Sequence, residues 1–372
     1  MGLTSNTVLL LSILFALMLF AGTVWLWPRL ARRSWRAVGG RVGLLLCTQL
    51  ALFVSVGLSA NQAFGFYASW ADLFGRETEP GVVVDHTNGA PAGPLRVVGS
   101  RRVEGGGGRP DFGGQIQKVV LVGRTTHIST PAYVYLPPEY FAAKNRTRTF
   151  PVAVVLTGYP GTAEALVDKL HYPRTARQLA GDGRMQPMIL VMLRPTVAPP
   201  RDTECVDIPG GPQTESFFAK DLPDAVGAHY RVGKRPASWG IIGDSTGGYC
   251  ALKLAMHHPE VYAAGAGLSA YYKAPSDPTT GDLFRGDETL RKEADLRWFL
   301  KNRSAPDTSL LVTSSRAGES NYKATLNFID LAKATDRTRI SSIILESGGH
   351  NFNTWRREIP PALEWLSGRL SN

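Results

Sequence analysis

Ile241-Ile242-Gly243-Asp244-Ser245-Thr246-Gly247-Gly248 is the most informative segment of this chain. The apolar residues 239–242 before it predict a short buried strand. The residues after it keep helical spacing until His258-Pro259. A Gly-x-Ser-x-Gly pentapeptide between a strand and a helix is typical of a nucleophile elbow, a tight turn that holds a serine hydroxyl out for attack. The alternative is a glycine-rich turn with an incidental serine.

The two glycines of the pentapeptide have a steric reason under this interpretation. A nucleophile elbow places its serine in a strained backbone conformation. Cβ atoms at Gly243 and Gly247 would then collide with the neighbouring strand and helix. The pattern therefore predicts Ser245 as the nucleophile of a hydrolase.

Strand-like and helix-like segments alternate along the rest of the chain. Residues 115–123 and 129–136 predict an antiparallel pair. The later apolar runs lie at 151–156, 188–192, 239–242, 263–268, 310–313 and 343–345, and helical patterns separate them at 164–170, 217–228, 248–258 and 321–332, with a last one at 359–370. This alternation predicts an α/β fold, with a mostly parallel sheet covered by helices on both faces.

A serine nucleophile needs a general base and an orienting carboxylate, which follow the serine in the order acid and then histidine in this fold. His350 follows the last strand-like run through a glycine pair, Ser347-Gly348-Gly349. His257 and His258 end the helix after Ser245 and are interpreted as helix-terminal residues. We therefore predict His350 as the base.

The predicted acid is Glu319, the first carboxylate after the penultimate strand. Asp307 precedes that strand, at the wrong end of the sheet, and Asp330 and Asp336 lie in or after the following helix. The alternative for Glu319 is a surface acid in the first turn of a helix.

The oxyanion of a tetrahedral intermediate needs backbone N–H donors. The first predicted donor is Thr246, directly after the serine. The second comes from the loop after the early strand, Gly158-Tyr159-Pro160-Gly161. Proline has no N–H group, so Tyr159 is the candidate and Gly161 is second. The alternative is an ordinary glycine turn.

The N-terminal residues predict a membrane anchor. Residues 8–27 contain no charge and are long enough to cross a bilayer, and a second uncharged run extends from about 42 to 62. An arginine-rich loop separates them, and the positive-inside rule places it in the cytoplasm, which leaves the rest of the chain extracytoplasmic. A single span and a cleaved signal peptide are the alternatives, but residues 1–7 carry no Lys or Arg.

The predicted organisation is a membrane anchor (1–75), a Gly/Pro-rich linker (76–114) and a catalytic domain (115–372). The formal charge is +10, of which +4 lies in residues 1–75. The basic residues of the remainder are scattered, which argues against nucleic-acid binding and favours attraction to anionic lipid or wall polymer.

Cys205 and Cys250 are the two cysteines of the predicted ectodomain, and an oxidising compartment favours a disulfide between them. The alternative is two separate buried thiols. Cys205 lies in the polar stretch 201–215, which is expected to border the site as a solvated loop. Asp202, Glu204 and Asp207 there lack regular ligand spacing, and no Cys/His pattern indicates a metal.

Residues from about 115 to 370 resemble the "putative esterase" family of α/β-hydrolases, which includes S-formylglutathione hydrolases and mycobacterial mycolyltransferases. The resemblance rests on residues 156–161, 243–248 and Gly348-Gly349-His350 in that order. It implies a Ser–Glu/Asp–His triad and an acyl-enzyme mechanism without a cofactor. Thr157 departs from the histidine that many hydrolases carry there, and the membrane-anchored layout looks like actinobacterial members.

The sequence therefore predicts a membrane-tethered, extracytoplasmic serine hydrolase that cleaves a small-molecule or lipid (thio)ester. An acyltransferase that moves the acyl group to a sugar or lipid hydroxyl is the first alternative. A hydrolase fold kept only for binding is the second.

Overall fold

The structure is a computed structural model that describes residues 6–31, 34–64, 93–103, 109–199 and 201–371. It divides into two units, Met1–Val82 and Val83–Asn372.

The described residues of the first unit form two helices, α1 (Asn6–Leu26) and α2 (Trp35–Phe64). Both are long and apolar enough to cross a membrane, judged by length and composition. They contact each other, with Thr23 Oγ1 2.9 Å from Thr48 Oγ1. Helix α2 begins at Trp35, several residues before the expected span, because the segment that carries Arg36 and Arg41 continues the helix.

The second unit is built on a nine-stranded sheet with the order β1-β2-β3-β5-β4-β6-β7-β8-β9. The strands are β1 (Leu95–Arg102), β2 (Gln115–Val122), β3 (Ser129–Leu136), β4 (Val152–Leu156), β5 (Ile189–Leu193), β6 (Trp239–Asp244), β7 (Ala264–Leu268), β8 (Ser309–Ala317) and β9 (Arg339–Ser347). Strands β1, β2, β3 and β5 pair antiparallel. All pairs from β5 to β9 are parallel.

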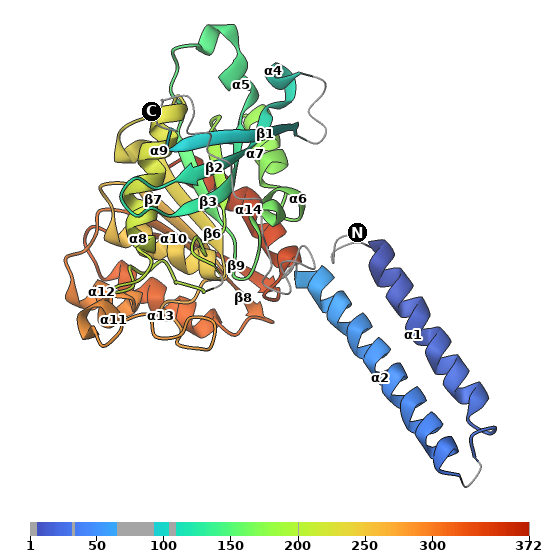
Figure 1. The fold of residues 1–372 in the computed structure, drawn as a ribbon. Coiled ribbons are helices and arrows are strands. Elements are labelled where there is room, and N and C mark those ends of the chain that lie inside the picture. Colours follow the sequence, from blue (N-terminus) through green and yellow to red (C-terminus); the bar gives the residue numbers. More distant parts are fainter. Residues whose placement is uncertain (1–5, 32–33, 65–92, 104–108, 200, 372) are drawn as a thin grey trace. The chain divides into compact units, whose positions relative to one another are not determined.

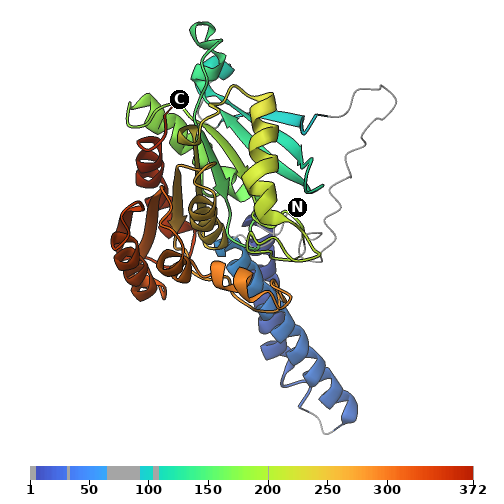
Figure 2. The ribbon, with the colours of Figure 1, turned by 90° about the vertical axis from the view of Figure 1, so that its left-hand side faces the viewer.

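Helices cover both faces of this sheet (Figure 1, Figure 2). The described helices of this unit are α4 (Pro110–Gly113), α5 (Pro138–Phe141), α6 (Ala163–Asp168), α7 (Tyr172–Gly181), α8 (Thr214–Ser216), α9 (Leu222–His229), α10 (Thr246–His257), α11 (Glu288–Glu293), α12 (Leu296–Asn302), α13 (Tyr322–Lys333) and α14 (Phe352–Ser367), with a π-helical turn at Phe217–Asp221 and 3-10 turns at Ala143–Asn145 and Pro236–Ser238.

The alternation of side chains along the central strands divides the core in two. Val152, Val154 and Leu156 of β4 pack with the cluster that includes α9, α10 and α13. Ala153 and Val155 face the opposite way, into the cluster that includes α6, α7 and α14. Because both faces are buried, these strands are apolar throughout. The predicted mostly parallel sheet with helices on both faces is confirmed.

The structure corrects the expected start of the catalytic domain. Leu95–Arg102 is strand β1, so the segment 76–114 that was interpreted as a linker already contains the first strand of the sheet. Only Leu95 of this strand is buried. An edge strand with one buried residue gives no apolar run, and its sequence therefore carried no strand signal.

Candidate functional site

Ser245 lies on the sharp turn between β6 and α10. Its backbone has φ 53° and ψ −121°, a positive φ that costs a non-glycine residue about 1–3 kcal/mol. Its N–H donates to the carbonyl of Leu268 on β7 at 2.9 Å. An added Cβ at Gly247 would collide with the carbonyl oxygens of Leu156 and Thr157, and one at Gly243 with the backbone of Gly247. The glycines thus let β4, β6 and α10 close tightly around the serine.

His350 reaches the serine from the loop between β9 and α14. Its Nε2 atom lies 2.8 Å from Ser245 Oγ, within hydrogen-bond distance. The loop is fixed on both sides of the histidine. Asn351 caps α14 by accepting the N–H groups of Asn353 and Thr354, while Gly349 N–H donates to Thr354 Oγ1 at 2.8 Å.

Trp355 supports the histidine ring from the first turn of α14. The His350 and Trp355 rings meet edge to face, with centroids 5.2 Å apart. The Trp355 indole in turn donates to Ser269 Oγ at 2.9 Å. Sequence analysis did not identify Trp355. Trp355 lies five residues after the histidine, in a helical turn that the sequence pattern does not predict. Its closeness to His350 in the sequence is the one signal that points to it.

Glu319 is brought to the histidine by a close approach of two loops. Gly318 has φ 98°, and an added Cβ there would collide with the carbonyl of Gly348. Gly348 N–H also donates to the carbonyl of Ala317 at 3.0 Å. Glu319 Oε1 consequently lies 4.0 Å from His350 Nδ1.

The Glu319–His350 contact is longer than a hydrogen bond, and it becomes an ion pair only when His350 is protonated. The Glu319 side chain is 1% exposed and that of His350 is 52% exposed. Neither carboxylate oxygen of Glu319 has a hydrogen-bond partner among the described residues. A shift of about 1 Å would therefore let it accept the Nδ1–H group, the kind of tightening seen when catalytic sites bind substrate.

The pKa of His350 is lowered from its ordinary value. Partial burial of the ring disfavours the charged imidazolium, and the negative charge of Glu319 opposes this effect in part. A lowered pKa keeps His350 neutral, and so able to accept a proton, at pH values below its usual range.

The two predicted oxyanion donors lie at the start of α10 and in the loop after β4. Thr246 is the first residue of α10, where the helix itself provides no acceptor for the backbone N–H. Tyr159 lies in the loop after β4, and its peptide bond with Pro160 is cis. Gly161, the second candidate in that loop, donates its N–H to the carbonyl of Gly158 at 2.8 Å and is engaged within the turn.

Asp244, directly before the serine, is a site residue that sequence analysis missed. Its Oδ2 atom accepts the N–H of Gly158 at 2.9 Å and so ties the loop after β4 to the elbow. Complete burial raises the pKa of Asp244 to about 7, opposed by its hydrogen bond from Gly158. The contact is close enough that a Cβ on Gly158 would meet Ser245 Cβ at 2.9 Å.

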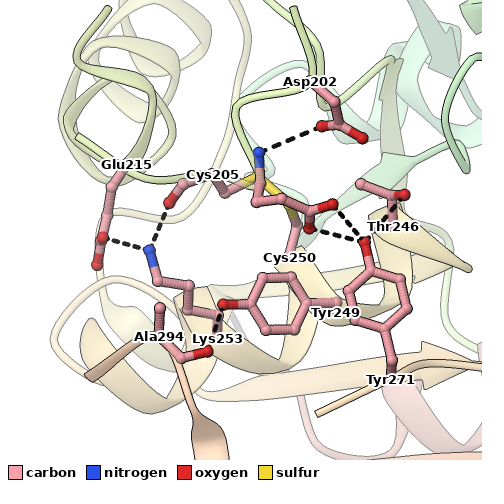
Figure 3. The surroundings of a disulfide bond; sticks show 10 residues. Asp202, Cys205, Glu215, Thr246, Tyr249, Cys250, Lys253, Tyr271 and Ala294 are labelled. Atoms are coloured by element: carbon pink, nitrogen blue, oxygen red, sulfur yellow. Dashed lines mark hydrogen bonds and ion pairs between the residues drawn. A yellow bond between two sulfur atoms is a disulfide. The ribbon is translucent and has the colours of Figure 1, made fainter. Parts of the chain in front are cut away.

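The loop 201–215 differs from its expected solvated state. Cys205 and Cys250 form the disulfide considered from the sequence, with Cα atoms 5.7 Å apart. Asp202 and Glu204 are buried, so the interpretation of these carboxylates as solvated is wrong. The disulfide joins this loop to α10 (Figure 3). The described residues contain no group of three or more His, Cys, Asp or Glu that could hold a metal ion.

Known proteins share the family and the fold of this chain. A model of the family described as "Putative esterase" matches residues 124–366. The chain belongs to this family. It has the α/β-hydrolase fold, as the resemblance in its motifs implied. A curated relative, an uncharacterized protein of Corynebacterium glutamicum, is 27% identical over 275 residues, which are 69% of this chain and 62% of the relative. The chain thus spans less than two thirds of that relative.

Solved structures share the fold at low identity. A ferulic acid esterase has a TM-score of 0.59 at 16% identity, covering 69% of this chain and 98% of that chain. An S-formylglutathione hydrolase from Agrobacterium tumefaciens has a TM-score of 0.58 at 17% identity, covering 74% and 100%. The fluorophosphonate-binding serine hydrolase F of Staphylococcus aureus has a TM-score of 0.56 at 18% identity, covering 68% and 98%.

The electrostatics of His350 predict how any ester hydrolysis by Ser245 and His350 should depend on pH. Since a neutral His350 accepts the serine proton, kcat/KM should fall on the acid side with an apparent pKa below about 6.5, the ordinary histidine value. Glu319→Gln should move this inflection to still lower pH, because a charge that favours imidazolium is removed. It should also lower kcat by about 10²-fold or more. An acid inflection above 6.5, or one that rises in Glu319→Gln, would contradict the assignment of the base.

Proposed function

We propose that this protein is a membrane-tethered serine esterase that works through an acyl-enzyme on Ser245. The observation that carries the proposal is the 2.8 Å contact between Ser245 Oγ and His350 Nε2, formed at a strained turn that exposes the hydroxyl. A serine is a weak nucleophile at neutral pH and becomes active when a positioned base takes its proton.

In the proposed reaction Ser245 Oγ attacks the ester carbonyl and His350 Nε2 takes the hydroxyl proton. Glu319 orients the imidazole and stabilises the imidazolium that forms. The N–H groups of Thr246 and Tyr159 hold the oxyanion. His350 then gives the proton to the leaving alcohol, whose C–O bond breaks. Water, deprotonated by the same histidine, releases the acid and restores Ser245.

Hydrolysis is favoured over acyl transfer because water has access to the base. The His350 side chain is about half exposed, and an acyltransferase needs to keep water away from its acyl-enzyme. The similar solved structures are named as a ferulic acid esterase and an S-formylglutathione hydrolase, which are hydrolytic enzymes. We therefore propose that a carboxylic ester or thioester is the substrate and water the acceptor.

We further propose that the first unit anchors the enzyme and that the catalytic domain faces the extracytoplasmic side. Two helices are long and apolar enough to span a membrane. The arginines of this unit lie in residues 29–41, where the first helix ends and the second begins. The Cys205–Cys250 disulfide supports this location, because structural disulfides persist in oxidising compartments and are rare in the cytosol.

A fluorophosphonate probe tests the nucleophile. Wild-type protein should label covalently, whereas Ser245→Ala should not label at all, because the attacking oxygen is gone. Ser320→Ala is the matched control: this exposed serine lies beside Glu319 and should leave the labelling rate unchanged. Equal labelling of wild type and Ser245→Ala would refute the proposal. A wild-type protein that never labels would favour a hydrolase fold kept for binding.

Cysteine accessibility tests the orientation. Ser34→Cys and Ser100→Cys are each introduced in a Cys47→Ser background, in which Cys205 and Cys250 remain bonded. A membrane-impermeant maleimide should label position 100 on intact cells and position 34 only after permeabilisation, since the arginine-rich side is cytoplasmic. The reverse pattern would place the catalytic domain inside.

A further inference from the structure

One face of helix α10 is joined to the loop 201–215 by a disulfide and by hydrogen bonds at successive turns (Figure 3). Thr246, Cys250, Lys253 and His257 are spaced by three or four residues and therefore share one side of the helix. Cys250 is bonded to Cys205. One turn further, Lys253 Nζ donates to the carbonyl of Cys205 and to Glu215 Oε2, each at 2.5 Å. His257 Nδ1 lies 2.8 Å from Glu215 Oε1.

The same face is fastened at its first residue, next to the nucleophile. Both carboxylate oxygens of Glu204 lie 2.7 Å from the Tyr271 hydroxyl. That hydroxyl lies 3.0 Å from Thr246 Oγ1 (Figure 3). In the contact between the Tyr271 and Thr246 hydroxyls, one hydroxyl donates and the other accepts. The Thr246 side chain is held in place in either arrangement.

Tyr271 is itself held in place. Its ring stacks on Tyr249, with centroids 5.1 Å apart and planes 19° apart. The Tyr249 hydroxyl donates to the carbonyl of Ala294 at 2.8 Å. The hydrogen bonds that link Glu204 to Thr246 therefore pass through Tyr271, whose ring cannot move away without breaking these contacts.

Glu204 occupies its position at a clear energetic cost. It is 1% exposed, and its backbone has φ 50°, a conformation that disfavours side chains. Burial, with the nearby charge of Asp202, raises its pKa well above the usual range. Lys253 and Glu215 form a separate buried ion pair further along α10. Costs of this kind concentrate at functional sites.

We propose that Glu204 is a positioning residue which, through Tyr271, fixes Thr246 so that its backbone N–H points at the oxyanion. This inference rests on the proposed acyl-enzyme function. Thr246 is one of the two proposed oxyanion donors, and loss of one such donor lowers kcat by about 10²–10³-fold in hydrolases. Glu204 touches no reacting atom and acts only by orienting the peptide between Ser245 and Thr246.

Tyr271→Phe is the first test, because it keeps the stacked ring and removes the hydroxyl. We expect kcat to fall about 10-fold or more with KM changed less than about twofold, since the lost contact serves the transition state. Affinity for a trifluoromethyl ketone, which forms an oxyanion on the serine, should weaken by a similar factor. Glu204→Leu should behave in the same way, and Glu204→Gln, which keeps an acceptor, should stay close to wild type.

Two further variants separate positioning from general destabilisation. Thr246→Val, which has the same shape without the hydroxyl, should match Tyr271→Phe, while Thr246→Ser should recover most of the activity. The double variant Tyr271→Phe/Thr246→Val should have the same kcat as either single variant, because both substitutions break the same series of hydrogen bonds. Tyr262→Phe is the matched control. Its hydroxyl donates to Phe218 O at 2.6 Å, so its loss should lower Tm and leave kcat unchanged.

All rates are expressed per active site, counted by fluorophosphonate labelling of the full chain. The inference is overturned if Tyr271→Phe and Thr246→Val lower Tm but keep wild-type kcat and ketone affinity, or if their effects multiply in the double variant. Failure of wild-type protein to label at Ser245 would refute the proposed function instead.

Discussion

The turn at Ser245 is the constraint on which the rest of the domain depends. A positive φ at a non-glycine residue persists only where its surroundings leave no alternative. Here a carbonyl from β7 accepts the serine N–H, and Gly247 packs against carbonyls that follow β4. Three parallel strands and one helix thus converge on a single residue. The parallel strands β6 to β9 have their carboxyl ends at one edge of the sheet. The loops after β8 and β9 therefore lie at the same edge as Ser245.

Much of this arrangement could be predicted from local patterns. The buried strands read as continuous apolar runs because both of their faces are covered, and the Gly-x-Ser-x-Gly turn identifies the order of strand and helix around it. His350 could be found because a glycine pair after the last strand marks a sharp turn. Its 2.8 Å contact with Ser245 agrees with the predicted order along the chain.

Other parts could not be predicted, for identifiable physical reasons. Strand β1 is an edge strand with one buried side chain and so lacks a periodic signal. Helix α14 begins at Phe352, seven residues before its recognised apolar pattern, because its first turn is set by the Asn351 cap and by Trp355 at the site. The burial of Glu204 depends on a disulfide and on Tyr271, which lies far away in sequence. Polar composition alone therefore suggested a solvated loop.

The disulfide gives the loop 201–215 a role beyond stability. It joins the same helix that begins with the proposed oxyanion donor, and buried ion pairs continue the attachment toward the helix end. Under the two proposals above, compartment and catalysis are connected through this element, because an oxidising environment favours the bond that joins the loop of Glu204 to α10.

Mass spectrometry of the quenched reaction can detect the proposed acyl-enzyme on Ser245. Full-length protein is mixed with an activated ester whose acyl group is released slowly, quenched within the first turnover and digested. The account predicts that the acyl mass is found on the peptide that contains Ser245 and disappears as the acid is released. Turnover with the acyl group on another residue, or with no acyl group on Ser245 during the first turnover, would contradict the proposed acyl-enzyme.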